Sequence, residues 1–382
     1  MAPDKESITI TVNITEGVRC AVAGVTLAGN YLDKDDEFKS LIKIKPGEAY
    51  NADQVAETTK AFTEHFGNDG YAFAQVEAVP EVDRVNNRVA ITLRSEPSRR
   101  AYVRRLNIQG NTRKRDEVIR REFRQYESSW YAAEKIRLSR DRVDRLGYFT
   151  ELSVSSAEVP GAPDQVDLNV EVKEKPTGSI SLGAGYSSAE KLAFTFGLSQ
   201  DNVFGSGNKL DLQLNTGKFN RTIVVSATDP YFTANGVSRT VDVYYRTQKP
   251  YQDQGGNYTL ITMGAGLKFG VPVTELDTVY LGINAERTRI KPGTNIPAAY
   301  LDYANRFGYT SSAFPFTLGW SRDSRDSALA PNSGRYQRLL GELGLFGDAR
   351  YVKANYQYQQ FVPLSKQYTL AFNGEVGWGK GL

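Results

Sequence analysis

The second half of the chain alternates large apolar side chains with polar or small ones in one segment after another, and this pattern restricts it to β-structure. From Gly178 onward, runs of about ten residues are separated by turns rich in Gly, Asn, Asp and Pro. Lys191–Gln200, which reads KLAFTFGLSQ, has large apolar residues at every second position. Because a strand has a side-chain period of two, one of its faces is then apolar and the other polar or small. Runs near the ~9–11 residues that a tilted strand needs to cross a bilayer favour an outer-membrane β-barrel, although strands of a soluble β-sandwich alternate in the same way.

We expect eleven strands in this half, arranged as an antiparallel up-and-down sheet. The expected ranges are 178–187, 191–201, 208–217, 221–230, 237–248, 258–271, 277–290, 311–322, 335–347, 350–362 and 367–380. The longest connection, Pro292–Thr310, should be a loop on the outside of the membrane.

The alternation also predicts which face each side chain occupies. On the lipid-facing side we expect Phe194, Leu212, Val243, Leu281, Phe316 and Tyr356. Asp211 and Asn355 should face the opposite way, into a hydrated lumen, because a packed core would not accommodate so many polar side chains.

Composition divides the chain near Lys175. Only 9 of the 34 glycines and 7 of the 22 tyrosines lie in residues 1–175, so a charged, helix-forming part precedes the strand-rich part. No stretch approaches the ~18 apolar residues of a transmembrane helix. The net charge of +3 is too small to indicate a partner, and the single cysteine, Cys20, cannot form an internal disulfide. The N-terminal string MAPDKESITITV lacks the features of a signal peptide, so we expect a fragment of a longer secreted precursor.

The first half contains a repeat of about eighty residues. VAGVTLAGN (Val22–Asn30) resembles VRRLNIQGN (Val103–Asn111) at an offset of 81. Two helical stretches should follow the first strand of each unit, at 115–124 and 132–146 in the second. Each unit therefore predicts a β-α-α-β-β module, an α+β layer of one small sheet covered by two helices. Residues 5–16 look like the last strand of a preceding unit.

These modules resemble POTRA domains, and the chain as a whole resembles the BamA family of outer-membrane protein assembly factors. The strings that carry the resemblance are RLGYFTELSV, VPGAPDQVDLNVEVKEKPTGSISLGAGYSS, SQDNVFGSGNKL and ATDPYFTANGVS. The family places POTRA domains in the periplasm and a transmembrane β-barrel in the Gram-negative outer membrane. The resemblance divides this chain into 1–16 (the end strand of a preceding POTRA domain), 17–97 and 98–176 (two POTRA domains), and 177–382 (the N-terminal part of the barrel).

The resemblance implies a function in assembling and inserting β-barrel proteins, as the core insertase subunit of the Bam complex. Its partners would be the Bam-complex lipoproteins, unfolded outer-membrane protein clients and outer-membrane lipids. The family's inward-folded loop with an Arg-Gly-Phe type motif does not occur in this sequence, and its closing strands are missing, so the barrel is expected to be incomplete.

In the family, the first barrel strand meets the last at a seam that can open. An open edge presents unpaired N–H and C=O groups, which must find partners in hydrocarbon, and an incoming strand supplies them by β-augmentation. Two glycines weaken side-chain pairing in this strand, although they could instead relieve crowding in a curved sheet. The expected gate strand consists of Gly178, Ser179, Ile180, Ser181, Leu182, Gly183, Ala184, Gly185 and Tyr186. Of these, Ile180, Leu182, Ala184 and Tyr186 should face lipid, and the Ser and Gly residues should face the lumen.

A basic cluster lies in the second module, between Arg99 and Arg124. Interleaved acidic residues and the absence of an aromatic stacking row disfavour nucleic acid as its ligand. A solvated helix face, contact with anionic lipid head groups and docking of an acidic partner remain open. The resemblance points to a periplasmic lipoprotein of the same machine, and the expected docking residues are Arg120, Arg121, Arg124 and Glu127.

The sequence offers no catalytic constellation. His65 stands alone on an expected helix, and Gly-x-Ser-x-Gly and Walker-type loops are absent. Asp323 and Asp326 could suggest a metal, but a turn before Pro331–Gly334 explains them more simply. We expect no enzymatic activity, no metal and no cofactor. The competing function is a two-partner secretion or autotransporter-assembly pore with the same POTRA-barrel plan, while a passive porin would not need two periplasmic modules.

Overall fold

The computed structural model describes residues 18–188, 191–249, 258–294, 296–327, 330–365 and 367–382. Internal contacts divide the chain into two units: Met1–Asn111 with Glu122–Glu174, and Thr112–Arg121 with Lys175–Leu382. Each unit is described by itself. The strand expected at residues 5–16 lies outside the described residues. Within the described ranges, no helix is both long enough and apolar enough to span a membrane.

The first module has the expected β-α-α-β-β order, with strand β3 between β1 and β2. Its core is aromatic: Phe38, Phe62 and Phe66 have no exposed surface, Phe38 contacts the other two rings in edge-to-face and tilted arrangements, and Tyr31 stacks on Phe66. The Tyr31 hydroxyl donates to the Leu93 carbonyl at 2.8 Å, which satisfies the one polar group in this cluster. The elements are β1 (Ala21–Gly29), α1 (Asp35–Ser40), α2 (Ala52–Asn68), β2 (Gln75–Asp83) and β3 (Arg88–Glu96).

The second module repeats this order, with β6 between β4 and β5. Its helix α4 confirms the expected helix at 132–146, but α3 is shorter than the expected 115–124. The reason is that the backbone N–H of Arg124 donates to Ser139 Oγ at 2.8 Å instead of continuing a helical ladder. The elements are β4 (Tyr102–Gln109), α3 (Asp116–Arg120), α4 (Ala133–Arg145), β5 (Phe149–Val159) and β6 (Ala162–Glu174).

The two modules share irregularities as well as topology, at the same offset of 81. The ladder shifts register between Val22 and Gly24 in one module and between Val103 and Arg105 in the other. Gly29 and Gly110 end the first strand of each with φ of 96° and 88°. In both cases an added Cβ would collide with a backbone carbonyl oxygen of the neighbouring strand. The sequence repeat is therefore a structural repeat that includes the register shifts and the positive-φ glycines.

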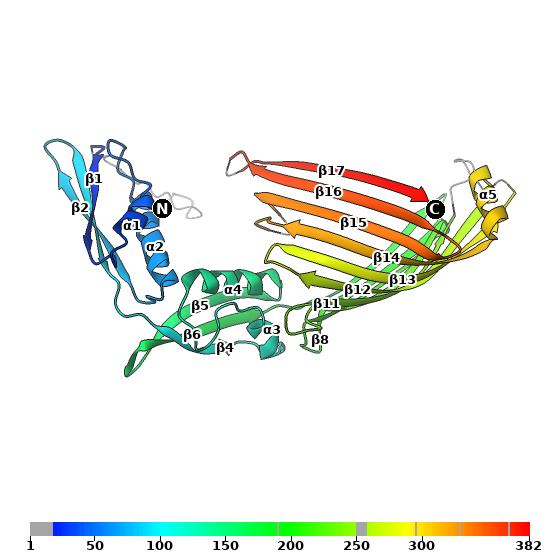
Figure 1. Cartoon of the computed structure of the whole chain (residues 1–382), viewed down its shortest axis with the longest axis horizontal. Coiled ribbons are helices and arrows are strands. Elements are labelled where there is room, and N and C mark those ends of the chain that lie inside the picture. The colour runs from blue at the N-terminus through cyan, green and yellow to red at the C-terminus, as the bar shows by residue number, and fades with distance from the viewer. Residues whose placement is uncertain (1–17, 189–190, 250–257, 295, 328–329, 366) are drawn as a thin grey trace, which may run out of the picture. The chain divides into compact units, whose positions relative to one another are not determined.

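The second unit is an eleven-stranded antiparallel sheet in simple chain order from β7 to β17 (Figure 1). Its strands confirm all eleven expected ranges to within two residues at each end. Its edges are β7 and β17, which do not pair with each other within the described sheet. The strands are β7 (Gly178–Ser187), β8 (Lys191–Val203), β9 (Asn208–Thr216), β10 (Asn220–Asp229), β11 (Ser238–Gln248), β12 (Tyr258–Pro272), β13 (Asp277–Pro292), β14 (Thr310–Asp323), β15 (Gly334–Gly347), β16 (Tyr351–Pro363) and β17 (Thr369–Gly381).

The register places the expected lipid-facing residues on one face of the sheet. Leu212 pairs with Val225, which pairs with Val243, and the same parity carries through to Phe316 and Tyr356. Asp211 pairs with Ser226 and Asn355 with Leu340, all on the opposite face. We call the first face outward and the second face inward.

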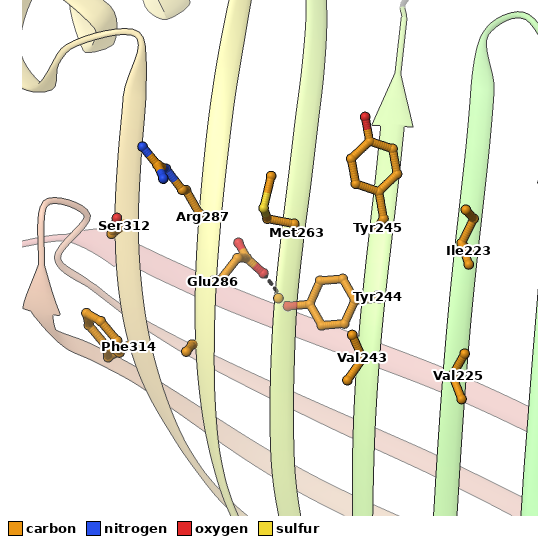
Figure 2. Close-up of a pocket in the computed structure, with 12 residues that line it drawn as sticks. Ile223, Val225, Val243, Tyr244, Tyr245, Met263, Glu286, Arg287, Ser312 and Phe314 are labelled. Atoms are coloured by element: carbon orange, nitrogen blue, oxygen red, sulfur yellow. Dashed lines mark hydrogen bonds between the residues drawn. The ribbon is translucent and has the colours of Figure 1, made fainter.

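Side chains on the inward face reach across neighbouring strands. The Tyr244 hydroxyl on β11 donates to the Glu286 carboxylate on β13 at 2.7 Å, passing over β12 (Figure 2). Gly264 on β12 makes this possible, because a Cβ there would lie 2.6 Å from the Tyr244 ring and hydroxyl. The inward face therefore carries a linked polar layer rather than an apolar core.

Two features of the sheet were not expected from the sequence. A helix, α5 (Ala298–Phe307), occupies the connection expected to be only a loop. The second feature is a register shift opposite Pro315 on β14, which leaves Leu345 of β15 as an extra residue between Gly344 and Phe346. Proline cannot donate to the ladder, and a β-bulge accommodates this loss.

The positive-φ glycines of the POTRA-like modules predict a stability difference between two substitutions. Gly29 and Gly47 both have positive φ, but only Gly29 has a backbone carbonyl where a Cβ would go, whereas Gly47 has open space. We expect Gly29→Ala to lower the free energy of unfolding of the first module by about 2 kcal/mol more than Gly47→Ala does. Pulse proteolysis in urea measures this difference. Equal losses for the two variants would show that the close approach does not matter.

Candidate functional site

Strand β7 is an edge with little side-chain support. It pairs only with β8 among the described strands, and all ten of its residues are exposed. Leu182 and Tyr186 on its outward face are 80% and 75% exposed. On the side away from its partner, an edge strand directs the N–H and C=O of every second residue toward whatever lies beside it.

The inward contact between β7 and β8 is made of interlocking small residues. Gly183 faces Thr195, and a Cβ on Gly183 would collide with the Thr195 hydroxyl. In the same way a Cβ on Gly197 would lie 2.5 Å from the Ser181 hydroxyl. Gly185, by contrast, has nothing near the position of a Cβ. Gly183 therefore leaves room for the Thr195 hydroxyl, whereas the space beside Gly185 is open.

The small residues leave a polar hollow of about 470 Å³ on the inward face. Ser179, Ser181 and Thr195 line one side of it, and Asp211 and Asn215 the other. Ser199 Oγ donates to Asp211 at 2.6 Å, so its carboxylate is already partly satisfied. The arrangement provides a hydrated wall beside the edge strand, with no group placed for covalent chemistry.

The four expected docking residues are divided between the two units. In the unit with the sheet, Arg120 donates to Asp116 at 2.7 Å within helix α3, and Arg121 stacks on the Tyr231 ring at 4.3 Å. In the other unit, Glu127 accepts the backbone N–H of Leu106 at 2.8 Å. Glu127 and Arg121 thus each make a contact within their own unit, in addition to any role in binding a partner.

The contacts of α3 with two turns of the sheet were missed by the sequence reasoning. Tyr231 follows β10, and its ring carries the Arg121 guanidinium while its hydroxyl donates to the Arg121 carbonyl at 3.4 Å. In the turn after β8, the Gly205 carbonyl accepts the N–H of Arg115 at 3.1 Å. At Gly207 a side chain would collide with the Arg121 guanidinium. The sequence VFGSGN of this turn, whose two glycines have positive φ, is the feature that could have indicated these contacts.

The acidic pair after β14 and the lone histidine have structural contacts. Asp323 pairs with Arg325 at 2.7 Å. Asp326 accepts the N–H groups of Ser333 and Asn332, which hold the pKa of its carboxyl below the usual value. His65 Nε2 lies 3.1 Å from the Glu37 carboxylate, and its ring packs edge-on against Phe38. These contacts agree with the turn expected for the acids and with a structural role for His65.

Comparison with known proteins matches both halves of the chain. The Omp85 superfamily domain matches residues 202–382, and the POTRA model, described as a surface antigen variable number repeat, matches residues 21–96 and 101–175. The outer membrane protein assembly factor BamA of Neisseria meningitidis serogroup B is 36% identical over 99% of this chain and 49% of its own length. BamA of Nitratidesulfovibrio vulgaris is 24% identical over 96% of the chain and 46% of its own length.

A solved structure agrees with these matches. BamA from Haemophilus ducreyi lacking POTRA domains 1–3 superposes with a TM-score of 0.71 at 26% identity, covering 95% of this chain and 71% of that one. The chain spans about half the length of the curated relatives it matches. Two β-α-α-β-β modules followed by an antiparallel barrel sheet, together with these similarities, show that the chain belongs to the BamA family of the Omp85 superfamily, whose POTRA domains are periplasmic and whose barrel lies in the outer membrane.

Proposed function

We propose that this chain assembles and inserts β-barrel proteins into the outer membrane as the core subunit of a Bam complex. The observation that carries the proposal is the contact of β7 with β8 in a chain of this family, because it consists of small Ser, Gly and Thr side chains. Its clients are unfolded outer-membrane proteins, and no covalent bond of the client is made or broken. The 36% identity to a BamA protein supports this function over the secretion pore.

The proposed mechanism is pairing of client strands with the free side of β7. In hydrocarbon each unsatisfied N–H or C=O costs several kcal/mol, so an open edge and a client edge gain strongly by pairing. The inward residues Ser179, Ser181, Gly183 and Gly185 add little side-chain selectivity. Pairing through the backbone tolerates many client sequences, which suits one machine with varied clients.

We further propose that a periplasmic lipoprotein of the complex docks on the second POTRA module near Arg120, Arg121, Arg124 and Glu127. Charge supports this surface, since three arginines lie within five residues of sequence. Because Glu127 also accepts a backbone N–H, its structural and docking roles must be separated experimentally.

A cysteine at the free edge should trap clients. In the full-length protein, we expect Ser181→Cys to form a disulfide with a cysteine in the terminal strand of a stalled client, since directly opposed residues on paired strands have Cβ atoms ~4.5–5.5 Å apart. The matched control is Ser199→Cys, which lies on β8 with all of β7 between it and the edge. Non-reducing electrophoresis detects the disulfide-linked product. Absence of the Ser181 crosslink, or an equal one from Ser199, would contradict edge pairing.

The packing of β7 on β8 should limit the rate of insertion. We expect Gly183→Ala to slow client insertion because its Cβ collides with Thr195, an overpacking cost of about 1–3 kcal/mol. Gly185→Ala, where space is open, should behave as wild type. Combining Gly183→Ala with Thr195→Ala should restore the rate. Proteoliposomes with a reporter client give the measurement, and equal defects at both glycines would contradict this account.

Two substitutions at Glu127 separate docking from structure. Glu127→Gln keeps an acceptor for the Leu106 N–H but removes the charge, whereas Glu127→Lys reverses the charge and loses the acceptor. If the charge recruits the lipoprotein, both variants should reduce its co-purification, and only Glu127→Lys should also destabilise the module. Retention of the lipoprotein by both variants would exclude Glu127 from the docking surface.

A further inference from the structure

The outward face of the sheet contains an apolar trough floored by two alanines. Ala265 on β12 pairs directly with Ala285 on β13, and Val243 pairs with Ala265 from the other side. Two hollows of about 530 Å³ and 770 Å³ adjoin here, and both are lined by Ala285 and Phe314. The small floor residues lie between larger neighbours, which form the sides of the trough.

The β-bulge opposite Pro315 builds one wall of this trough. The extra residue Leu345 lines the same hollow as Phe346 and Phe314, although strict alternation would place neighbours on opposite faces. Phe346 is 72% exposed, so the described residues leave most of this wall uncovered. The bulge therefore enlarges an apolar surface that already faces lipid.

Three cations stand directly beyond the trough on the outward face of β13. Arg287, Arg289 and Lys291 occupy alternate positions after Ala285, and all three are exposed. Figure 2 shows Arg287 beside Met263 and Ser312, in the row above Phe314. Strand geometry separates successive members by about 7 Å, so they form a column of positive charge that continues the line of the trough.

The neighbours of this column do not neutralise it. Arg287 is flanked by Met263 and Ser312, and Arg289 by Ile261 and Thr310. Among the described residues, no carboxylate forms an ion pair with any of the three cations. Glu286 lies on the inward face and accepts from Tyr244, and Asp348 accepts the backbone N–H of Ser312.

The column lies at the depth of the outer head groups. Strand β7 begins where the second POTRA module ends, and simple antiparallel order makes β13 run in the same direction, from the periplasmic end outward. On its outward face β13 is apolar at Val279, Leu281, Ile283 and Ala285 and becomes cationic at Arg287, in the row that contains Tyr245. Tyrosine is typical of the membrane–water interface, so the cations begin where the hydrocarbon ends.

We propose that the trough binds an acyl chain of an outer-leaflet lipid whose head group carries phosphate, and that Arg287 and Arg289 bind that phosphate. Guanidinium groups donate bidentate, charge-assisted hydrogen bonds to phosphate oxygens. A neutral lipid could fill the trough but would leave the cation column without a counter-charge. The site is separate from β7 and does not rest on the proposed insertion function.

Native mass spectrometry of the full-length protein in detergent tests the site, with lipid A as the phosphorylated lipid. Arg287→Gln combined with Arg289→Gln should weaken lipid A binding roughly 10- to 30-fold, about fivefold for each charge. The charge-preserving pair Arg287→Lys and Arg289→Lys should bind with intermediate strength, because the charges remain but the bidentate hydrogen bonds are lost. Arg221→Gln is the matched control, because Arg221 is an exposed outward arginine in the same row as Arg289 but lies three strands away.

Head group and trough are tested separately. Dephosphorylated lipid A should bind the wild-type protein as weakly as lipid A binds the double glutamine variant. Ala285→Phe should weaken the binding of both lipids, because the phenylalanine ring fills the floor of the trough. Competition by millimolar inorganic phosphate should be slight. Equal binding of lipid A to wild type and to the double glutamine variant would overturn the proposal. So would an equal loss in Arg221→Gln, full competition by inorganic phosphate, or unchanged binding to Ala285→Phe.

Discussion

Backbone hydrogen bonding in a medium without water is the constraint on which the barrel half depends. Each N–H and C=O inside the hydrocarbon needs a partner, and a sheet provides one for every residue except those at its edges. Ten ladders link the eleven described strands in chain order, and among them β7 pairs only with β8. The proposed function uses the same requirement, because a client strand that pairs with β7 satisfies the backbone groups of both strands.

Side chains determine how firmly each region is held. The first POTRA module buries Phe38, Phe62 and Phe66 completely, and such a core is stable without any partner. Strand β7 has no buried residue, and its contact with β8 consists of Ser, Gly and Thr groups that fit closely but bury little apolar area. A strand held mainly by its backbone can exchange one neighbour for another at small cost. The same chain thus combines a densely packed aromatic core in the first POTRA module with an edge strand that has few apolar side-chain contacts.

Periodicity allowed most of the fold to be predicted from sequence. A side-chain period of two fixes both the existence of a strand and its faces, so all eleven strands and the outward positions of Val243 and Phe316 could be predicted. Features that depend on contacts between residues distant in sequence could not be predicted. The early end of α3 depends on Ser139, and the stacking of Arg121 on Tyr231 joins residues 110 positions apart. Helix α5 is short and lies within a long connection, and the extra residue Leu345 breaks the period of its strand, so neither was predicted.

The central claim is that clients are inserted through an edge of β7 that must be free. A reversible disulfide between β7 and the last strand of the complete barrel tests this most directly, through the rate at which full-length protein inserts a client into liposomes. The account predicts that oxidation abolishes insertion and that reduction restores it in the same sample. Insertion at the normal rate with the seam locked would contradict the account.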